Sequence, residues 1–150
     1  KVCVQVLLRT AVARAVGVEL SRFRHGIACD LLQRCGPGVA GRLQLVHGDC
    51  LDVCMDDATV VLLCATTFAG STIDAVGAKL DALPNLRTIL MLNMFRKLLA
   101  NFYLAKTLEV STSWTPSELH VYHRKEAVPL FGPFRPPLAF ASAHSSPSAA

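Results

Sequence analysis

Several features that would identify a class of function are scarce in this sequence. Only 17% of its 150 residues are charged, and no block of about five like charges forms a nucleic-acid-binding arm. The formal net charge of +4 therefore permits an acidic partner without requiring one. No apolar run reaches the ~18 residues of a membrane-spanning helix, so we expect no membrane partner.

Short motifs of catalysis and metal binding are also missing. The sequence has no GxxxxGK[ST] phosphate loop and no GxSxG nucleophile elbow. Its six cysteines include no CxxC pair, and most lie in apolar segments, so we expect buried, reduced thiols in an intracellular protein. His120 and His123 form an HxxH pair, but residues three apart on a strand face opposite sides. We therefore predict no metal site.

Apolar residues at helical spacing predict three helices. Ser21 is a suitable N-cap for the second helix, and the glycines around Pro37 end it. Ser71 or Thr72 caps the third. The predicted helices cover residues 1–12, 21–34 and 71–83, and residues 95–104 form a short helix or an ordered loop.

Aliphatic runs between these helices predict a parallel sheet. The expected strands cover residues 14–20, 43–46, 58–65, 86–92, 107–114 and 118–122. The last two alternate in polarity around a turn at residues 115–117, so they form an antiparallel hairpin. Alternating strands and helices favour an α/β sheet covered on both faces.

This order of elements resembles the Rossmann-like sheet of class I S-adenosylmethionine-dependent methyltransferases, which ends in an antiparallel hairpin. The chain begins inside an apolar pattern without Met, so we interpret it as a cut fragment in which the first strand and its glycine-rich loop are missing. We expect a methyltransferase core at 1–125. The Pro-, Ser- and Ala-rich segment 126–150 has no packing pattern, and we expect it to be a disordered tail.

Three of the expected strands end in residues that could bind a ligand. In an open α/β sheet, ligands bind beyond the carboxyl ends of the strands. Glu19 ends one strand, where an acid can accept hydrogen bonds from both ribose hydroxyls, and Asp49 follows the next, where it can bind the adenine amine. Each acid alone is also typical of a helix cap or a turn. The segment Thr66-Thr67-Phe68 follows the strongest strand and could line an acceptor channel, or form an ordinary turn.

Motifs along residues 1–125 resemble one family within this class. The segment 1–34 with its Gly-Val-Glu, then HGDCLD, ATVVLLCATTF and LEVSTSWTPSELHVYHR, appear in the order found in disruptor-of-telomeric-silencing (Dot) type histone lysine methyltransferases. The resemblance implies S-adenosylmethionine as cofactor, a protein acceptor such as a histone, and a nuclear location. Nucleic acid or a nucleosome is a further partner that the family brings with it.

The resemblance also assigns roles to individual residues. Glu19, with Leu20 beside it, would hold the ribose, and Asp49 would bind the adenine amine. Cys50 would pack on adenine, and Cys64 would lie at the cofactor after the fourth strand of the family's sheet. Thr66, Thr67 and Phe68 would lie near the methyl donor and the lysine channel. Histone-modifying members carry Asn where an ungapped match places Cys64 and Ala65.

Three functions are therefore open from the sequence. The first is a Dot-like protein lysine methyltransferase using in-line methyl transfer, which depends on positioning and desolvation rather than on a strong base. The second is a class I methyltransferase that acts on a small molecule or nucleic acid. The third is a degenerate, non-catalytic domain of this fold that binds a partner.

Overall fold

The computed structural model describes residues 1–112 and 116–125. The elements alternate between strands and helices and close with a hairpin, as expected. A short helix at Pro37–Ala40 is an addition, because the sequence analysis expected only the end of a helix there. The predicted tail at 126–150 lies outside the described residues. No helix in the described ranges combines the length and apolar character needed to cross a membrane.

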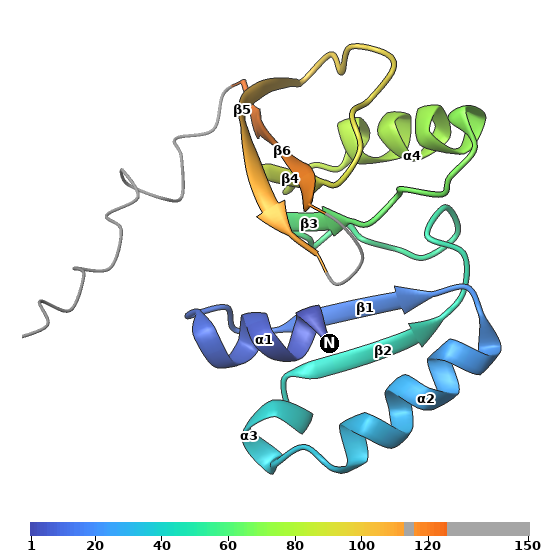
Figure 1. Ribbon diagram of the computed structural model, residues 1–150, viewed down its shortest axis with the longest axis vertical. Helices are drawn as coiled ribbons and strands as arrows, with labels where there is room; N and C mark the ends of the chain where they lie inside the picture. The colour runs from blue at the N-terminus through green and yellow to red at the C-terminus, as the bar shows by residue number, and fades with distance from the viewer. Residues whose placement is uncertain (113–115, 126–150) are drawn as a thin grey trace, which may run out of the picture.

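The first half of the chain forms a two-stranded parallel sheet with its helices packed on it (Figure 1). Leu7, Val39 and Leu43 form its small buried cluster. The strands pair from Ala15 with Leu43 to Glu19 with His47. The elements are α1 (Val2–Arg9), β1 (Ala15–Glu19), α2 (Arg22–Gln33), α3 (Pro37–Ala40) and β2 (Leu43–His47).

The second half forms a four-stranded sheet in the order β3-β4-β6-β5. β3 and β4 are parallel, whereas β6 is antiparallel to both of its neighbours. The predicted C-terminal hairpin is therefore confirmed, with a mixed sheet built around it. The elements are β3 (Val60–Leu63), α4 (Gly70–Ala82), β4 (Thr88–Met91), β5 (Phe102–Ser111) and β6 (Pro116–Arg124).

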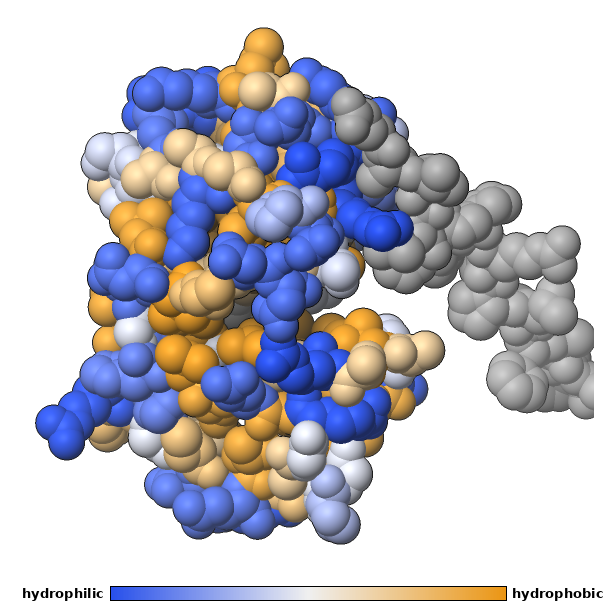
Figure 2. All heavy atoms as spheres, turned by 180° about the vertical axis from the view of Figure 1, so that it is seen from behind, coloured by the Kyte–Doolittle hydropathy of each residue, from blue (hydrophilic) through white to orange (hydrophobic). Residues whose placement is uncertain are grey.

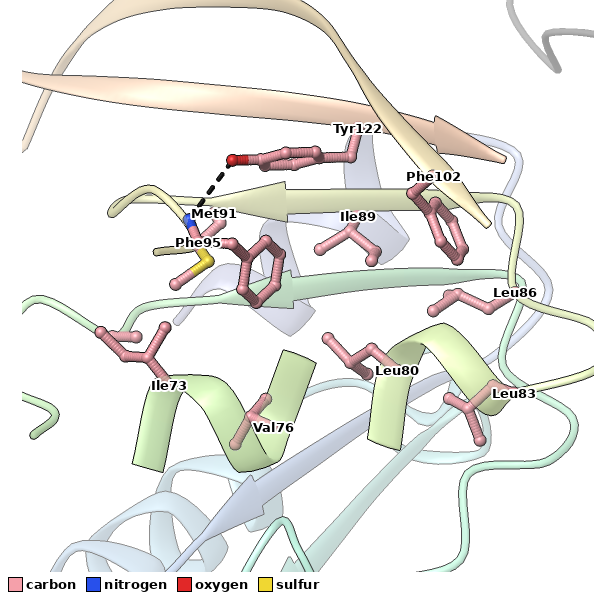
Figure 3. Close-up of a cluster of buried hydrophobic side chains, with 11 residues drawn as sticks. Ile73, Val76, Leu80, Leu83, Leu86, Ile89, Met91, Phe95, Phe102 and Tyr122 are labelled. Carbon is pink, nitrogen blue, oxygen red and sulfur yellow. Dashed lines mark hydrogen bonds between the residues drawn. The ribbon is translucent and has the colours of Figure 1, made fainter. Parts of the chain in front are cut away.

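The main core lies between this second sheet and α4 (Figure 3). Leu80 of α4 faces Ile89 of β4, and Met91 of β4 lies beside Phe95; Leu80, Ile89 and Met91 are at most 2% exposed. The hydroxyl of Tyr122 accepts a hydrogen bond from the backbone N–H of Phe95 (3.4 Å), and the two rings meet edge to face. The hydroxyl thus has a partner within an apolar core, as buried polar groups require.

The two sheets stand next to each other with the edges of β1 and β3 unpaired among the described residues. Both strands run in the same direction (Figure 1). A cavity of about 580 Å³ lies between them, lined by Val16, Val18, Val61 and Leu63 among others. Figure 2 shows apolar side chains gathered around a hollow at this level. The hollow therefore lies along two strand edges, of β1 and β3, that no other strand of the described residues pairs.

Several sequence predictions need correction at their limits. The helix expected over 1–12 is confined to Val2–Arg9, and α4 starts after Ala69 without a side-chain cap, instead of at Ser71 or Thr72. The segment 95–104 contains no helix: Phe102 already starts β5, because pairing with β6 extends this strand. The expected strand over 58–65 is shortened to Val60–Leu63.

The glycines after α2 form a sequence pattern that is typical of dinucleotide binding. Gly36, Gly38 and Gly41 have the spacing of a GxGxxG dinucleotide loop, which the sequence analysis overlooked. In the structure they surround α3, after a helix and before β2. A dinucleotide loop follows a strand and opens a helix at the carboxyl edge of the sheet. These glycines therefore lie at the wrong edge for phosphate binding.

The cysteines follow the expectation in part. All six are free thiols, and four are partly buried. Cys54 and Cys64 are exposed, contrary to the prediction that the thiols are buried. His120 and His123 pair with Met91 and Thr88 of β4. Because they are three residues apart on β6, their side chains face opposite sides of the strand.

Candidate functional site

The carboxyl ends of β1, β2, β3 and β4 lie at the same edge of the molecule (Figure 1). Glu19 is the last residue of β1 and pairs with His47, the last residue of β2. The N–H of Gly48 donates to the carbonyl of Glu19 (3.1 Å), so Asp49 follows directly beside the end of β1. The two acids predicted to bind adenosine are therefore neighbours across adjacent strands.

Glu19 is held by the start of the following helix. Its Oε1 accepts hydrogen bonds from the Ser21 N–H (2.7 Å) and from Nη2 of Arg24 (2.9 Å). The bond from Arg24, with that from Ser21 next, lowers the pKa of Glu19. The side chain is 31% exposed. Glu19 is thus an ionised, pre-oriented carboxylate at the strand end, and both contacts use only one of its oxygens.

Asp49 starts a tight turn. Its Oδ1 accepts the N–H of Leu51 (2.8 Å), and its carbonyl accepts the N–H groups of Asp52 (3.0 Å) and Val53 (3.1 Å). Cys50 and Leu51 are partly buried against the main core. The turn that the sequence analysis offered as the alternative for Asp49 is therefore present. The turn holds the Asp49 carboxylate at the edge of the sheet where the carboxyl ends of the strands lie.

Burial makes the thiol of Cys50 a poor nucleophile. Desolvation, followed by the negative charge of Asp49, raises the pKa of Cys50. A neutral thiol at physiological pH behaves as a small apolar group. This suits the packing role predicted for Cys50 and argues against covalent chemistry there.

The residues predicted to line the acceptor side follow β3, across the gap from the two acids. Thr66 and Thr67 are exposed, whereas Phe68 is partly buried and packs on the main core. Cys64 is exposed, although desolvation still raises its pKa. The N–H of Phe68 bonds to the carbonyl of Ala65 (3.2 Å), so this segment is a turn leading into α4.

Some residues at this edge escaped the sequence analysis. Arg24 holds Glu19, and Nε2 of His47 lies 3.1 Å from the carbonyl of Leu20. The rings of His25 and His47 are 5.5 Å apart between centroids. Leu20 itself is 66% exposed. An arginine in the first turn after a strand-end acid is a signal that could have predicted the Arg24 contact.

The residues present fit one half of an S-adenosylmethionine molecule. Two carboxylates at adjacent strand ends match the hydroxyls of a ribose and the amine of an adenine, which are all hydrogen-bond donors. The glycine-rich loop that would hold the methionine end is not found at this edge in the described residues. No group of three metal-ligating side chains occurs within residues 1–112 and 116–125.

No protein-family model matches this sequence, and no curated protein matches it either. Solved structures do match its fold. An S-adenosylmethionine complex of a Streptococcus pneumoniae protein assigned as a tRNA (m1A22) methyltransferase superposes with a TM-score of 0.65 at 14% identity. The match covers 81% of this chain and 59% of that one, so the chain spans about three fifths of that protein.

Two further solved structures match the fold of this chain. An RNA methyltransferase from Salinibacter ruber, bound to S-adenosylhomocysteine, has a TM-score of 0.64 at 16% identity over 87% of this chain and 77% of its own. The methyltransferase domain of a bacterial Hen1 protein has a TM-score of 0.62 at 12% identity, covering 81% of this chain and 82% of that domain. The described residues therefore have the Rossmann-like fold of these class I S-adenosylmethionine-dependent methyltransferases.

Proposed function

We propose that this chain is the core of an S-adenosylmethionine-dependent methyltransferase, with the adenosine of the cofactor held by Glu19 and Asp49. The observation that carries the proposal is the placement of both carboxylates at the ends of adjacent parallel strands. The ribose would lie at Glu19 with Leu20 beside it, and adenine at Asp49 and Cys50. Solved proteins of this fold contain the same cofactor or its product.

The chemistry of the site depends on position more than on acid–base groups. The cofactor supplies a sulfonium methyl group that a neutral nucleophile can attack in line. Thr66 and Thr67 are exposed at the end of β3, where their hydroxyls can orient an acceptor. Holding two reactants in line accounts for much of the rate in such reactions.

For the acceptor, we favour nucleic acid over a histone. Two of the solved proteins with this fold are described as acting on tRNA or RNA. Arg96 lies against Gly70 at the start of α4, beside the Thr66–Phe68 turn, and is exposed. A cation there favours an acidic acceptor.

A Dot-like lysine methyltransferase is the second candidate. It is favoured by the ordered motifs Gly-Val-Glu on β1 and HGDCLD at the end of β2. The third motif, LEVSTSWTPSELHVYHR, begins on β5 and ends on β6, and its residues 113–115 lie outside the described residues. Cys64 and Ala65 stand where histone-modifying members carry Asn, and Ala65 is fully buried. Neither Cys64 nor Ala65 can therefore take the place of the side-chain amide of that Asn.

Calorimetric titration of the chain with S-adenosylhomocysteine tests the cofactor site. We expect Glu19→Ala and Asp49→Ala each to weaken binding by about ten- to a hundredfold, since each removes a charged hydrogen-bond acceptor. The matched controls are Glu109→Ala on the edge strand β5 and Asp30→Ala on α2, both exposed. Binding that neither site variant weakens would show that the cofactor lies elsewhere and that the proposed site is wrong. Absence of binding would overturn the cofactor proposal and favour a non-catalytic domain.

The acceptor is tested by transfer of a radiolabelled methyl group from the cofactor to RNA or, separately, to histones. We expect label in RNA and a lower yield with Arg96→Ala. Label in histones alone would establish the Dot-like candidate instead.

A further inference from the structure

Lys79 makes an unusual set of contacts beside the proposed adenine site. Its Nζ donates hydrogen bonds to the carbonyls of Cys50 (2.8 Å), Leu51 (2.7 Å) and Val53 (2.6 Å). An ammonium group has three N–H donors. All three are therefore used on the main chain of one short loop, which lies 26 to 29 residues away in the sequence.

The loop that Lys79 binds is the turn begun by Asp49. The carboxylate of Asp49 accepts the Leu51 N–H at the amino end of the turn, while the Lys79 ammonium binds carbonyls along it. Carboxylates are favoured at exposed backbone N–H groups, and cations at exposed carbonyls. Two oppositely charged side chains therefore stabilise the turn: the Asp49 carboxylate binds a backbone N–H within it, and the Lys79 ammonium of α4 binds its carbonyls.

α4 gives Lys79 a rigid base. Its neighbours on the helix, Val76 and Leu80, are 4% and 2% exposed within the main core. Lys79 itself is half-buried. The Lys79 side chain therefore links the main core to the turn that contains Asp49 and Cys50.

We propose that Lys79 is a positioning residue of the adenine site: it holds the Asp49–Val53 turn in the conformation that presents the Asp49 carboxylate and the Cys50 side chain to the base. This inference rests on the proposed function. It adds that recognition of the adenine amine depends on a residue that itself does not contact the cofactor.

Lys79→Met tests the proposal, because methionine keeps much of the apolar stem and removes the three donors. The matched control is Lys97→Met: the side chain of Lys97 is 76% exposed and forms an ion pair with Asp74 of α4 (3.0 Å). We expect the amides of Leu51, Asp52 and Val53 to exchange with solvent about tenfold faster in Lys79→Met. We expect no change in Lys97→Met.

A ligand pair separates positioning from general stability. S-adenosylhomocysteine carries the adenine amine, whereas S-inosylhomocysteine has a carbonyl in that position, and a carbonyl oxygen only accepts hydrogen bonds and therefore repels the Asp49 carboxylate. We expect the wild-type chain to prefer the adenosyl ligand by about tenfold or more, and Lys79→Met to lose most of that preference. Loss of stability alone would weaken both ligands equally and leave the ratio unchanged.

Lys79→Arg covers the case in which Lys79→Met does not fold. Arginine keeps the charge, but its rigid fork cannot direct three N–H groups at three carbonyls as an ammonium does. We expect an intermediate preference for the adenosyl ligand. A wild-type ratio in the folded Lys79 variants would overturn the positioning role and leave the proposed function intact. Failure of the wild-type chain to bind either ligand would overturn both.

Discussion

The four-stranded sheet and the β1–β2 pair differ in how completely their apolar surfaces are covered. Leu80, Leu86, Ile89 and Met91 of the second half are each at most 2% exposed. In the first half, the buried cluster consists of three residues, and α2 has no buried residue at all. Most of the hydrophobic stabilisation therefore resides in the second half.

This difference would separate the part of the fold that provides most of the stability from the proposed binding site. The half with the larger core supplies the rigid base, including α4. The half with the smaller core carries Glu19, and Asp49 follows its last strand. Ligand-binding segments are commonly drawn from the less stable parts of a protein. Binding of a cofactor is thus expected to stabilise the first half more than the second.

The largest effect in a test of this comparison is expected from truncation in the main core. Leu80→Ala should lower the free energy of unfolding by about 3 kcal/mol, because it leaves a cavity in the main core beside Ile89. Leu31→Ala on α2 removes the same atoms from a residue that is 54% exposed, and should cost less than about 1 kcal/mol. Urea unfolding measures both. Equal losses would contradict the comparison.

A smaller effect is expected from Arg42, which ties the first half together. Its guanidinium donates to the carbonyls of Leu7 (3.0 Å), Val12 (3.0 Å) and Gly38 (2.9 Å). Arg42→Ala should cost about 1–2 kcal/mol and increase amide exchange in β1 and β2 but not in β4. Arg22→Ala, at an exposed position, serves as control. Uniform exchange across both sheets would show that the two halves unfold as one unit.

The pH dependence of Glu19 gives a more local test. Because Arg24 and Ser21 lower its folded pKa, the Glu19–Arg24 pair stabilises the protein above the ordinary glutamate value of 4.5, and this is lost as the pH falls through the lowered pKa. A carbon NMR titration of the Glu19 carboxyl should give a midpoint below 4.5 that rises in Arg24→Ala. An unchanged midpoint in that variant would exclude the ion pair.

The smallest effect concerns thiol reactivity. Cys54 is exposed, whereas burial and Asp49 raise the pKa of the partly buried Cys50. Iodoacetamide should therefore alkylate Cys54 about tenfold faster than Cys50, as followed by mass spectrometry of peptides. In urea the two rates should converge. Equal rates in the folded chain would mean that the Asp49 turn is open.

The sequence predicted the order of the elements well, but not which surfaces they cover. Helical spacing of Phe23, Ile27 and Leu31 correctly indicates α2, yet these side chains are 77%, 46% and 54% exposed. Periodicity identifies a helix and its apolar stripe, but only tertiary contacts decide what lies on it. The early start of β5 at Phe102 has the same origin, since pairing with β6 adds residues that carry no strand pattern of their own.

The candidate site shows a similar limit. A rule about strand ends was enough to select Glu19 and Asp49 as candidate ligand-binding residues. The contact between Lys79 and the Asp49 turn joins segments 26 to 29 residues apart and leaves no short motif. Sequence patterns reveal residues at the ends of elements, whereas residues that support them from another element become apparent only in the fold.

The facing edges of β1 and β3 have a consequence for the behaviour of the chain in solution. Unpaired edges without charge or proline are sites of edge-to-edge aggregation, and β3 consists only of Val60-Val61-Leu62-Leu63. A single extended segment, laid in the same direction as both strands, would satisfy the two rows of backbone donors and acceptors together. We therefore expect the purified chain to self-associate through these edges, which are unpaired among the described residues, and such a segment to suppress that association.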